Sequence, residues 1–359
     1  MALGRVEVPV APPYPVVVGA GLDLAGTISA ELEPGLAAIL TDSNVGSLYA
    51  MQVTRALEDA GWRVADVLEV PAGEASKGLA TYAGVARGLA RAGLTRDATL
   101  FALGGGVVGD LGGFVAATYM RGIDLVALPT SLLAIVDSSV GGKVGVDLPE
   151  GKNLIGSFLR PRLVASDLDW LRTLPERELS GGLAEVVKMG LLSGGRYFED
   201  LEGVGAAKAR DAGALRALIL DSVRFKARVV AEDELEAGRR AILNYGHTIG
   251  HGLEAATGYA LSHGEAVAAG MVAAAHLSRE RFGADLVGLH EELLAAAGLP
   301  AKAPGVDPGK VLDAMGRDKK RRADDETHRF VLLEGVGRPV WGVPVREEEA
   351  REAIEAVVA

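Results

Sequence analysis

The sequence predicts two parts, an α/β domain built on a mostly parallel sheet and a mostly α-helical domain that follows it. Up to about residue 165, short β-rich runs alternate with helical runs, which is the pattern of a parallel α/β sheet. From about residue 168, long helical segments follow one another. The chain has 359 residues, which is long for one hydrophobic core. We therefore expect an N-terminal domain at residues 1–167 and a C-terminal domain at residues 168–359.

The strands of the first domain are expected where short runs of Val, Ile, Leu and Ala occur, at residues 16–18, 37–40, 64–70, 99–103 and 125–128. Helices are expected between them, for example at residues 46–60 and 79–92. Ligands bind at the carboxyl ends of the strands in open sheets of this kind. Polar segments follow three of these strands, at residues 41–44, 104–110 and 129–131, and predict a binding site there.

The second domain is expected to consist of long helices at residues 175–192, 206–234, 242–257, 264–282 and 286–297. Near its C-terminal end, residues 317–322 form a basic run, which we interpret as a solvated loop from which one lysine could reach an anionic substrate.

The composition is that of a folded enzyme, and it limits the kinds of molecule that the protein is expected to bind. The net charge of −11 argues against a nucleic-acid-binding protein, because a phosphate backbone requires a basic surface. There are no cysteines, so a metal would be bound by His, Asp or Glu. No apolar run reaches the roughly 18 residues of a membrane span, and the N-terminus lacks the pattern of a signal peptide. We expect a cytoplasmic protein that contacts neither nucleic acid nor membrane.

A glycine run after one expected strand predicts a nucleotide site. Gly104, Gly105 and Gly106, then Gly109 and Asp110 at the start of a helix, let backbone N–H groups approach a pyrophosphate at the positive end of the helix dipole. The alternative is a glycine-rich turn that serves only close packing of helix and strand. Likewise, Asp42 could bind ribose hydroxyls or could cap a helix.

Residues 131–153 have the composition of an anion site. Asp137, a Gly-Gly turn, Lys143 and Lys152 lie within this short segment. The alternative is that both lysines are solvated surface residues, although glycines rather than other charges flank them.

Three of the six histidines, His247, His251 and His263, lie within 17 residues and predict a divalent metal site. If the segment is helical, Arg240 and Asn244 share one face with the first two histidines, at steps of four, three and four.

The metal site needs a third ligand, and a carboxylate is expected. Glu185 is the candidate, because it lies three residues before Lys188 on a helix with apolar neighbours. The alternatives are ordinary buried histidines and a surface ion pair between Glu185 and Lys188.

Taken together, these segments resemble the 3-dehydroquinate synthase family of the sugar phosphate cyclase superfamily over nearly the whole chain. The resemblance is carried by Gly73-Glu-Ala-Ser-Lys77, Gly104-Gly-Gly-Val-Val-Gly-Asp110, Tyr119-Met-Arg-Gly122, Pro129-Thr-Ser-Leu-Leu-Ala-Ile-Val-Asp137, Ser138-Ser-Val-Gly-Gly-Lys143, Gly151-Lys-Asn153, Ala184-Glu-Val-Val-Lys188, Asn244-Tyr-Gly-His-Thr-Ile-Gly-His251 and Ser262-His-Gly-Glu265.

The resemblance implies a lyase of the shikimate pathway, which leads to chorismate and the aromatic amino acids. Its substrate would be the anionic sugar phosphate 3-deoxy-D-arabino-heptulosonate 7-phosphate, and its products 3-dehydroquinate and phosphate. The reaction would proceed by transient oxidation with NAD, β-elimination of phosphate, re-reduction, ring opening and an intramolecular aldol step. The resemblance also implies a Rossmann-like NAD domain, a divalent metal that is usually zinc and sometimes cobalt, a homodimer, and an active site in the cleft between the domains, which we expect to close about a hinge near residues 167–175.

The resemblance assigns roles to individual residues. The metal ligands would be Glu185, His247 and His263, with His251 as a catalytic residue beside the metal. The NAD contacts would be Asp42, Asn44, Glu74, Lys77, Gly105, Gly106, Val107, Val108, Gly109, Asp110, Thr130, Ser131, Lys143, Lys152, Trp170, Leu171, Arg172 and Thr173. The other catalytic and substrate contacts would be Arg121, Asp137, Lys143, Lys152, Asn153, Lys188, Lys226, Arg240, Asn244 and Lys319. Ser131 stands where many members have Thr, and Trp170 is bulkier than expected.

Three other functions stay open at this point. A sugar phosphate cyclase that forms an inosose or a valiolone-type product would share the NAD loop and the metal ligands. A metal-dependent polyol dehydrogenase of similar architecture would release NADH. A non-catalytic NAD-binding sensor could keep the glycine loop, but it would have no reason to keep the three metal ligands together.

Overall fold

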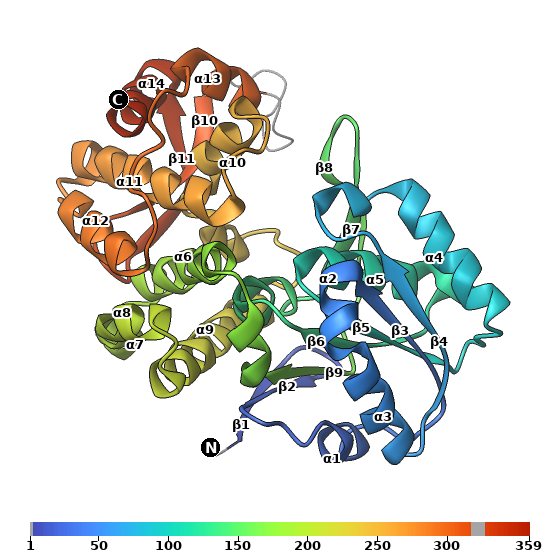
Figure 1. Ribbon diagram of the computed structural model, residues 1–359. Helices are drawn as coiled ribbons and strands as arrows, with labels where there is room; N and C mark the ends of the chain where they lie inside the picture. The colour runs from blue at the N-terminus through green and yellow to red at the C-terminus, as the bar shows by residue number, and fades with distance from the viewer. Residues whose placement is uncertain (1–2, 317–326) are drawn as a thin grey trace. The chain divides into compact units, whose positions relative to one another are not determined.

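The computed structural model describes residues 3–316 and 327–359 and divides the chain into two compact units (Figure 1). We call residues 1–174 with 226–231 the N-terminal unit, and residues 175–225 with 232–359 the C-terminal unit. The α/β and helical characters predicted for the two parts are confirmed. The two units are defined by contacts between residues, which do not test where one domain ends or where substrate binds. The domain boundary at residue 167 and the active site between the domains therefore stay predictions.

The N-terminal unit contains a seven-stranded sheet with the order β1-β2-β9-β6-β5-β3-β4. All neighbouring strands are parallel except β1 and β2, which are antiparallel. The strands are β1 (Gly4–Val8), β2 (Tyr14–Gly19), β3 (Leu36–Asp42), β4 (Arg63–Val70), β5 (Thr99–Gly104), β6 (Asp124–Pro129) and β9 (Leu163–Asp167). The five expected strands are present as β2 to β6, whereas β1 and β9 were not predicted.

The central strands of the sheet are buried on both faces, because their side chains point alternately to the two faces and helices cover both. Ile39 and Phe101 pack on one face, where α1 (Leu24–Ser29) and α3 (Met51–Asp59) lie. Leu40 and Leu100 pack on the other, against α4 (Leu79–Arg91) and α5 (Gly106–Thr118). This explains why the strands read as continuous apolar runs. Between β3 and α3 lie the short helix α2 (Ser43–Val45) and the π-helix η1 (Gly46–Ala50).

A separate antiparallel hairpin, β7 (Lys143–Leu148) and β8 (Gly151–Phe158), lies against α5. The close contact requires glycine, because a Cβ atom at Gly113 would lie 2.2 Å from Val144 Cγ1. The hairpin was not predicted, although it carries Lys143, Lys152 and Asn153. Short 3₁₀- and π-helices complete the unit: η2 (Glu74–Ser76), η3 (Tyr119–Arg121), η4 (Ala134–Ser138) and η5 (Leu168–Thr173).

The C-terminal unit is mostly helical and is built around α11 (His263–Phe282), most of whose residues are buried. Helix α11 contacts α6 (Glu176–Ser193), α10 (His247–Ala256), α12 (Val287–Ala296) and α14 (Glu347–Val358). The other elements are α7 (Gly195–Asp200), η6 (Leu201–Gly203), α8 (Val204–Lys208), η7 (Arg239–Asn244), α13 (Pro308–Gly316) and the antiparallel pair β10 (Thr327–Leu333) and β11 (Pro339–Arg346). Helix α9 (Ala212–Glu232) belongs to this unit except for residues 226–231, which are part of the N-terminal unit.

Two predicted helices of this unit are wrong in their extent. The segment expected to be one helix at residues 206–234 consists of α8 and α9. The helix expected at residues 242–257 begins only at His247, because Gly246 before it has the left-handed φ of 78°. Residues 239–244 form the 3₁₀-helix η7 instead.

Glycines let α6, α10 and α11 approach closely. A Cβ atom at Gly264 would lie 2.3 Å from Gly181 Cα, and one at Gly270 would lie 2.1 Å from the Gly246 carbonyl oxygen. Both contacts involve backbone atoms, which cannot move aside as a flexible side chain could. The approach is therefore specified by the absence of side chains at these positions.

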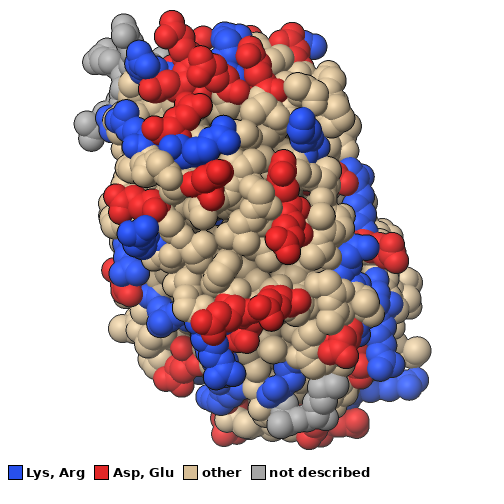
Figure 2. Space-filling model, turned by 90° about the vertical axis from the view of Figure 1, so that its left-hand side faces the viewer, with Lys and Arg blue, Asp and Glu red and all other residues tan. Residues whose placement is uncertain are grey.

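Within the described ranges, no helix combines the length and the apolar character needed to cross a membrane. On the face shown in Figure 2, acidic and basic side chains are interspersed over most of the surface, and basic side chains are more numerous along the right-hand edge of the view.

We expect Gly264→Ala to destabilise the protein, because the new methyl group would overlap the backbone of α6 at Gly181. Overpacking of this kind costs about 1–3 kcal/mol. The matched control is Gly288→Ala on α12, where a Cβ atom meets nothing within 4 Å. There, alanine should stabilise by up to about 1 kcal/mol through its higher helix propensity. Urea unfolding measures both, and equal stability of the two variants would contradict the close-packing argument.

Candidate functional site

Three side chains from three helices of the C-terminal unit meet at one point. They are Glu185 from α6, His247 at the start of α10 and His263 at the start of α11. Glu185 Oε1 lies 3.6 Å from His247 Nε2 and 3.8 Å from His263 Nε2. Two ligands of one zinc ion lie about 3.3 Å apart, given bonds of about 2.0–2.1 Å in a tetrahedral site. The separations are therefore near those of a metal site and too long for direct hydrogen bonds.

Local structure makes His247 and His263 the first residues of their helices. Gly246, in the left-handed conformation, ends the preceding turn and starts α10 at His247. Ser262 caps α11 through a reciprocal capping box with Glu265, which places His263 at the first helical position. Arg177 from α6 donates to both carboxylate oxygens of Glu265, at 3.0 and 2.5 Å, and so ties the start of α11 to α6.

His247 is arranged as a neutral imidazole with its Nε2 lone pair available. Its Nδ1 lies 3.1 Å from the Tyr245 carbonyl oxygen and donates a hydrogen bond to it, so in the neutral ring Nε2 carries no hydrogen. Burial and the nearby charges of Lys188 and His263 hold the pKa of His247 well below its usual value. Neutral imidazole is the form that binds a metal.

His263 also uses its two ring nitrogens differently. Its Nε2 faces Glu185, and its Nδ1 lies 3.4 Å from Glu254 Oε1. The ring lies between two carboxylates. Burial alone would lower the pKa of His263, but Glu185 and Glu254 raise it to about 9, so a metal bound at Nε2 would displace a proton.

Glu185 is a fully buried carboxylate whose two oxygens make no hydrogen bond of normal geometry with the described residues. Burial alone would raise its pKa, but the charges of Lys188 and His263 lower the pKa of Glu185 to about 2. Lys188 forms an ion pair with Oε2. An ionised buried carboxylate without hydrogen bonds is costly, and a divalent cation would satisfy it. Glu185, His247 and His263 thus fit a zinc ion with one open position.

The other predicted residues of this unit do not share a helix face. Arg240 and Asn244 lie in η7, so the continuous face at steps of four, three and four is wrong; only His247 and His251 lie one turn apart on α10. Arg240 is buried, and its main-chain N–H donates to Asp233 at 2.9 Å. The His251 ring is exposed and its centroid lies 5.3 Å from that of His247.

In the N-terminal unit, the glycine run forms the predicted turn from strand to helix. Strand β5 ends at Gly104, and α5 begins at Gly106, so the first N–H groups of a 13-residue helix have no intrahelical partner. The Thr130 N–H donates to the Gly104 carbonyl oxygen at 2.9 Å, which brings the ends of β5 and β6 together. Cβ atoms at Gly105 and Gly106 would approach the hydroxyls of Ser131 and Ser138, at 3.5 and 3.3 Å.

Charged residues around this turn are paired with one another. Lys77 Nζ lies 2.6 Å from Asp110 Oδ2, and Lys152 Nζ lies 3.3 Å from Glu74 Oε1. Burial, only partly offset by Lys77, raises the pKa of Asp110. Asp42 caps α2, because its Oδ1 accepts from the N–H groups of residues 44 and 45 at 2.9 and 3.0 Å. The capping role considered for Asp42 is therefore present.

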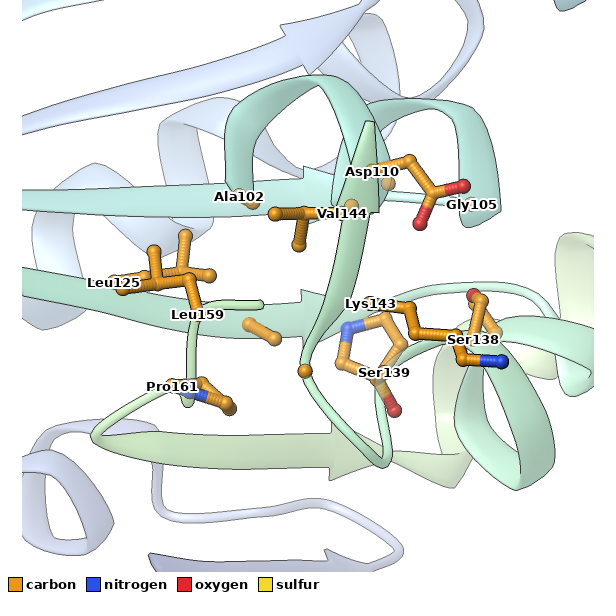
Figure 3. Close-up of a pocket in the computed structure, with 16 residues that line it drawn as sticks. Ala102, Gly105, Asp110, Leu125, Ser138, Ser139, Lys143, Val144, Leu159 and Pro161 are labelled. Carbon is orange, nitrogen blue, oxygen red and sulfur yellow. The ribbon is translucent and has the colours of Figure 1, made fainter. Parts of the chain in front are cut away.

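A partly open pocket with an empty volume of about 420 Å³ lies beside the turn. In Figure 3, Leu125, Leu159 and Val144 line one end of it, whereas Asp110 and Lys143 lie near the carboxyl ends of the strands. The pocket thus combines an apolar wall with charged groups of both signs.

Asp137 lies in η4, and Lys226 Nζ donates to its carbonyl oxygen at 2.6 Å and forms an ion pair with its carboxylate. Asn153 and Arg121 have positive φ values of 53° and 68°, which non-glycine residues rarely adopt. The Asn153 N–H donates to Asp147 Oδ1 at 2.6 Å, which fixes the turn of the hairpin.

The predicted segment 170–173 forms the end of η5. The side chains of Trp170 and Leu171 are buried, and Trp170 belongs to the core of the N-terminal unit, whereas Arg172 and Thr173 are exposed. Lys319 lies outside the described residues.

Residues 67–181 match the model of the 3-dehydroquinate synthase N-terminal domain, and residues 182–321 match that of the C-terminal domain. A 3-dehydroquinate synthase from Symbiobacterium thermophilum is 50% identical over 350 residues, which are 94% of this chain and 92% of that protein. The chain belongs to the 3-dehydroquinate synthase family.

Two solved structures similar to this 3-dehydroquinate synthase family member are sugar phosphate cyclases. A 2-deoxy-scyllo-inosose synthase complexed with carbaglucose-6-phosphate, NAD⁺ and Co²⁺ is 28% identical, with a TM-score of 0.91 and coverage of 99% of this chain and 100% of that one. A 2-epi-5-epi-valiolone synthase from Streptomyces hygroscopicus with NAD⁺ and Zn²⁺ bound is 27% identical, with a TM-score of 0.86 and coverage of 99% and 98%.

Sequence reasoning missed three residues that surround the histidines of this family member. Glu254 could have been found, because it lies three residues after His251 on the same helix. No sequence pattern pointed to Tyr245 and His290, because they are 45 residues apart and meet only in the folded protein. Tyr245 Oη donates to His290 Nε2 at 2.8 Å, and His290 Nδ1 donates to the Leu286 carbonyl oxygen at 2.7 Å. Tyr245 is thereby anchored, and its carbonyl is the acceptor for His247.

His290 predicts a pH dependence of stability. Burial lowers the pKa of His290 to about 4, from about 6.5 in an unfolded chain. The unfolded state therefore binds a proton at His290 more tightly than the folded state does. The stability that the neutral, buried His290 contributes is complete above about pH 6.5 and is lost as the pH falls from about 6.5 to about 4. The loss is about 3 kcal/mol.

We expect His290→Gln to reduce the dependence of the free energy of unfolding on pH between about pH 7 and pH 4, because this linkage disappears. Urea denaturation at several pH values measures it, with the half-exposed His276→Gln on α11 as the control that should flatten the profile less. A profile for His290→Gln that runs parallel to that of the wild type would contradict the assignment.

Proposed function

We propose that the protein catalyses the 3-dehydroquinate synthase reaction, which converts 3-deoxy-D-arabino-heptulosonate 7-phosphate to 3-dehydroquinate and phosphate. Membership of the family supports this reaction, and the convergence of Glu185, His247 and His263 is the structural observation on which the proposal depends. We further propose that the protein is a homodimer, as the resemblance implies, and that it is cytoplasmic, as expected from the sequence.

We assign Glu185, His247 and His263 as ligands of a divalent metal, with zinc as the first choice. Two neutral nitrogens and one carboxylate oxygen are the ligand set of many catalytic zinc sites, which keep one position open for substrate. The Co²⁺ and Zn²⁺ in the two related cyclases support a divalent ion without deciding which one is used here.

We assign the turn after β5 as the NAD pyrophosphate site. The N–H groups at the start of α5 are available for phosphate oxygens, and Gly105 and Gly106 leave room for them beside Ser131 and Ser138. The NAD⁺ in both related structures supports this assignment. Asp42, Asn44, Glu74, Lys77, Thr130 and residues 170–173 stay proposed contacts.

When bound, NAD would exchange a hydride with the substrate, and the metal ion would act as a Lewis acid on a substrate oxygen. The chain's own residues would bind and orient the anion. Lys152, Asn153 and Arg121 are proposed for the phosphate, with the unusual φ values of Asn153 and Arg121 directing their main-chain and side-chain groups. Arg240 and Lys143 are proposed for the carboxylate or the hydroxyl groups.

His251 is proposed to orient the substrate or to move a proton at a substrate hydroxyl, because its exposed ring lies next to His247. Asp137, Lys188, Lys226 and Asn244 complete the proposed set. Lys226 is held by Asp137, and Asn244 Nδ2 donates to Glu236 Oε1 at 3.0 Å, so both side chains have fixed positions before substrate binds.

The alternative within the superfamily is a cyclase that forms an inosose or valiolone-type product, which the high TM-scores of two such enzymes keep in view. The identity of 50% to a 3-dehydroquinate synthase, against 27–28% to those cyclases, favours the proposed substrate.

The purified protein should release phosphate from 3-deoxy-D-arabino-heptulosonate 7-phosphate, and this release should stop when a chelator removes the metal and return on addition of Zn²⁺ or Co²⁺. Sedoheptulose 7-phosphate and glucose 6-phosphate serve as competing substrates. Turnover of only these two would refute the proposed substrate, and net accumulation of absorbance at about 340 nm would indicate a dehydrogenase that releases NADH.

We expect His263→Ala to lose metal and activity while it keeps its affinity for NAD, because the proposed NAD contacts belong to the N-terminal unit. The loss of activity should exceed about 100-fold, as expected when a Lewis acid is removed. His276→Ala on the same helix is the matched control and should keep both metal and activity. Metal content by atomic emission and NAD affinity by fluorescence measure the two sites separately. An active His263→Ala protein with full metal content would overturn the ligand assignment.

A further inference from the structure

Glu254 is a second buried carboxylate in the C-terminal unit, and the proposed reaction gives it no role. It lies on α10, seven residues after His247, and only 4% of its surface is exposed. Its Oε1 lies 3.4 Å from His263 Nδ1. A carboxylate almost fully removed from water needs a specific partner, and an imidazole N–H provides one.

The two nitrogens of His263 face different carboxylates. Nε2 lies 3.8 Å from Glu185 Oε1, on the side where His247 Nε2 also lies, and Nδ1 faces Glu254. An imidazole bound to a metal through one nitrogen donates its other N–H to an acceptor, which fixes the tautomer and the ring orientation. His263 has this arrangement if the metal lies on its Nε2 side.

We propose that Glu254 is the positioning residue of the metal site: its carboxylate accepts the Nδ1 proton of His263 and so directs Nε2 toward the cation bound with Glu185 and His247. This inference rests on the metal site of the proposed function. It adds a residue that does not touch the metal but sets the affinity for it.

Glu254 could instead be a metal ligand, because His251, Glu254 and His263 also bring one ligand atom each within 4.8 Å of one another. A metal in this second group would use His263 Nδ1. It would leave Glu185 Oε1 without a cation, because Lys188 pairs with Oε2, and it would replace the buried His247 by the exposed His251. The cost of leaving this buried oxygen unsatisfied favours the first group.

The two proposed histidine ligands are supported by unlike acceptors. His247 donates to the neutral carbonyl of Tyr245, whereas His263 faces an ionisable carboxylate. A hydrogen bond to a charged acceptor is roughly twice as strong as one to a neutral acceptor. Glu254 therefore raises the basicity of His263 more than Tyr245 raises that of His247, and its loss should weaken metal binding measurably.

The test compares Glu254→Gln with Glu185→Gln after removal of the native metal and titration with Co²⁺. Glutamine keeps the volume and an acceptor oxygen but removes the charge. The Co²⁺ affinity of Glu254→Gln should fall about 10–100-fold, with one Co²⁺ per chain and a visible absorption spectrum of the same ligand class as the wild type. Glu185→Gln should lose the spectrum. Glu291→Gln, at an exposed position on α12, removes the same charge and should bind Co²⁺ like the wild type.

Three results would overturn the proposal. Affinity of Glu254→Gln within about twofold of the wild type would show that the hydrogen bond does not set metal binding, since loss of such a partner costs about 10–100-fold. A lost Co²⁺ spectrum in Glu254→Gln with a retained one in Glu185→Gln would make Glu254 a ligand of the second group. Absence of any Co²⁺ binding by the wild type would remove the metal site itself.

Circular dichroism in chelator checks that each variant is folded, and Glu254→Ala provides a second variant that should bind Co²⁺ more weakly than Glu254→Gln. Because Co²⁺ binding is measured without substrate, phosphate release on the same preparations reports separately on the proposed reaction. A wild type that binds Co²⁺ but turns over no sugar phosphate would contradict the reaction and leave the role of Glu254 intact.

Discussion

The C-terminal unit depends on one costly interaction, the burial of the Glu185 carboxylate. Its surface is 0% exposed, and its oxygens have no hydrogen bond of normal geometry among the described residues. Lys188 and His263 lower its pKa to about 2 against the opposing effect of burial, so it stays ionised. Such a charge is tolerated only where compensating groups converge, and the neighbouring helices supply them.

That convergence depends in turn on how closely three helices pack. Glu185, His247 and His263 are far apart along the chain, and each lies on a different helix. Gly181 and Gly264 let the backbones of α6 and α11 touch, and Gly246 and Gly270 do the same for α10 and α11. Side chains at these positions would push the helices apart by more than the few tenths of an ångström that metal coordination tolerates. The glycines therefore serve the site as much as the fold.

The residue types of the site could be predicted from the sequence, but their arrangement could not. The strands β2 to β6 and the helices α4, α6, α11 and α12 follow from apolar runs and helical periodicity. The break at Gly246 did not, because residues 240–251 keep a helical spacing even though η7 and α10 are separate helices. The hairpin β7–β8 was missed because its glycines and short polar runs give no clear strand pattern. The contact of Tyr245 with His290 joins residues 45 apart, which no local pattern reveals.

Buried lysines show how an acidic chain can present fixed cations to an anionic ligand. Lys77, Lys188 and Lys226 are each at most 6% exposed, and each is paired with a carboxylate, from Asp110, Glu185 and Asp137 respectively. Each carboxylate satisfies the buried ammonium group beside it and holds it in place, at the expense of part of the attraction of that group for a further anion. Lys143 and Lys152 of the β7–β8 hairpin are more exposed than these three lysines, and Lys152 is paired in turn with Glu74.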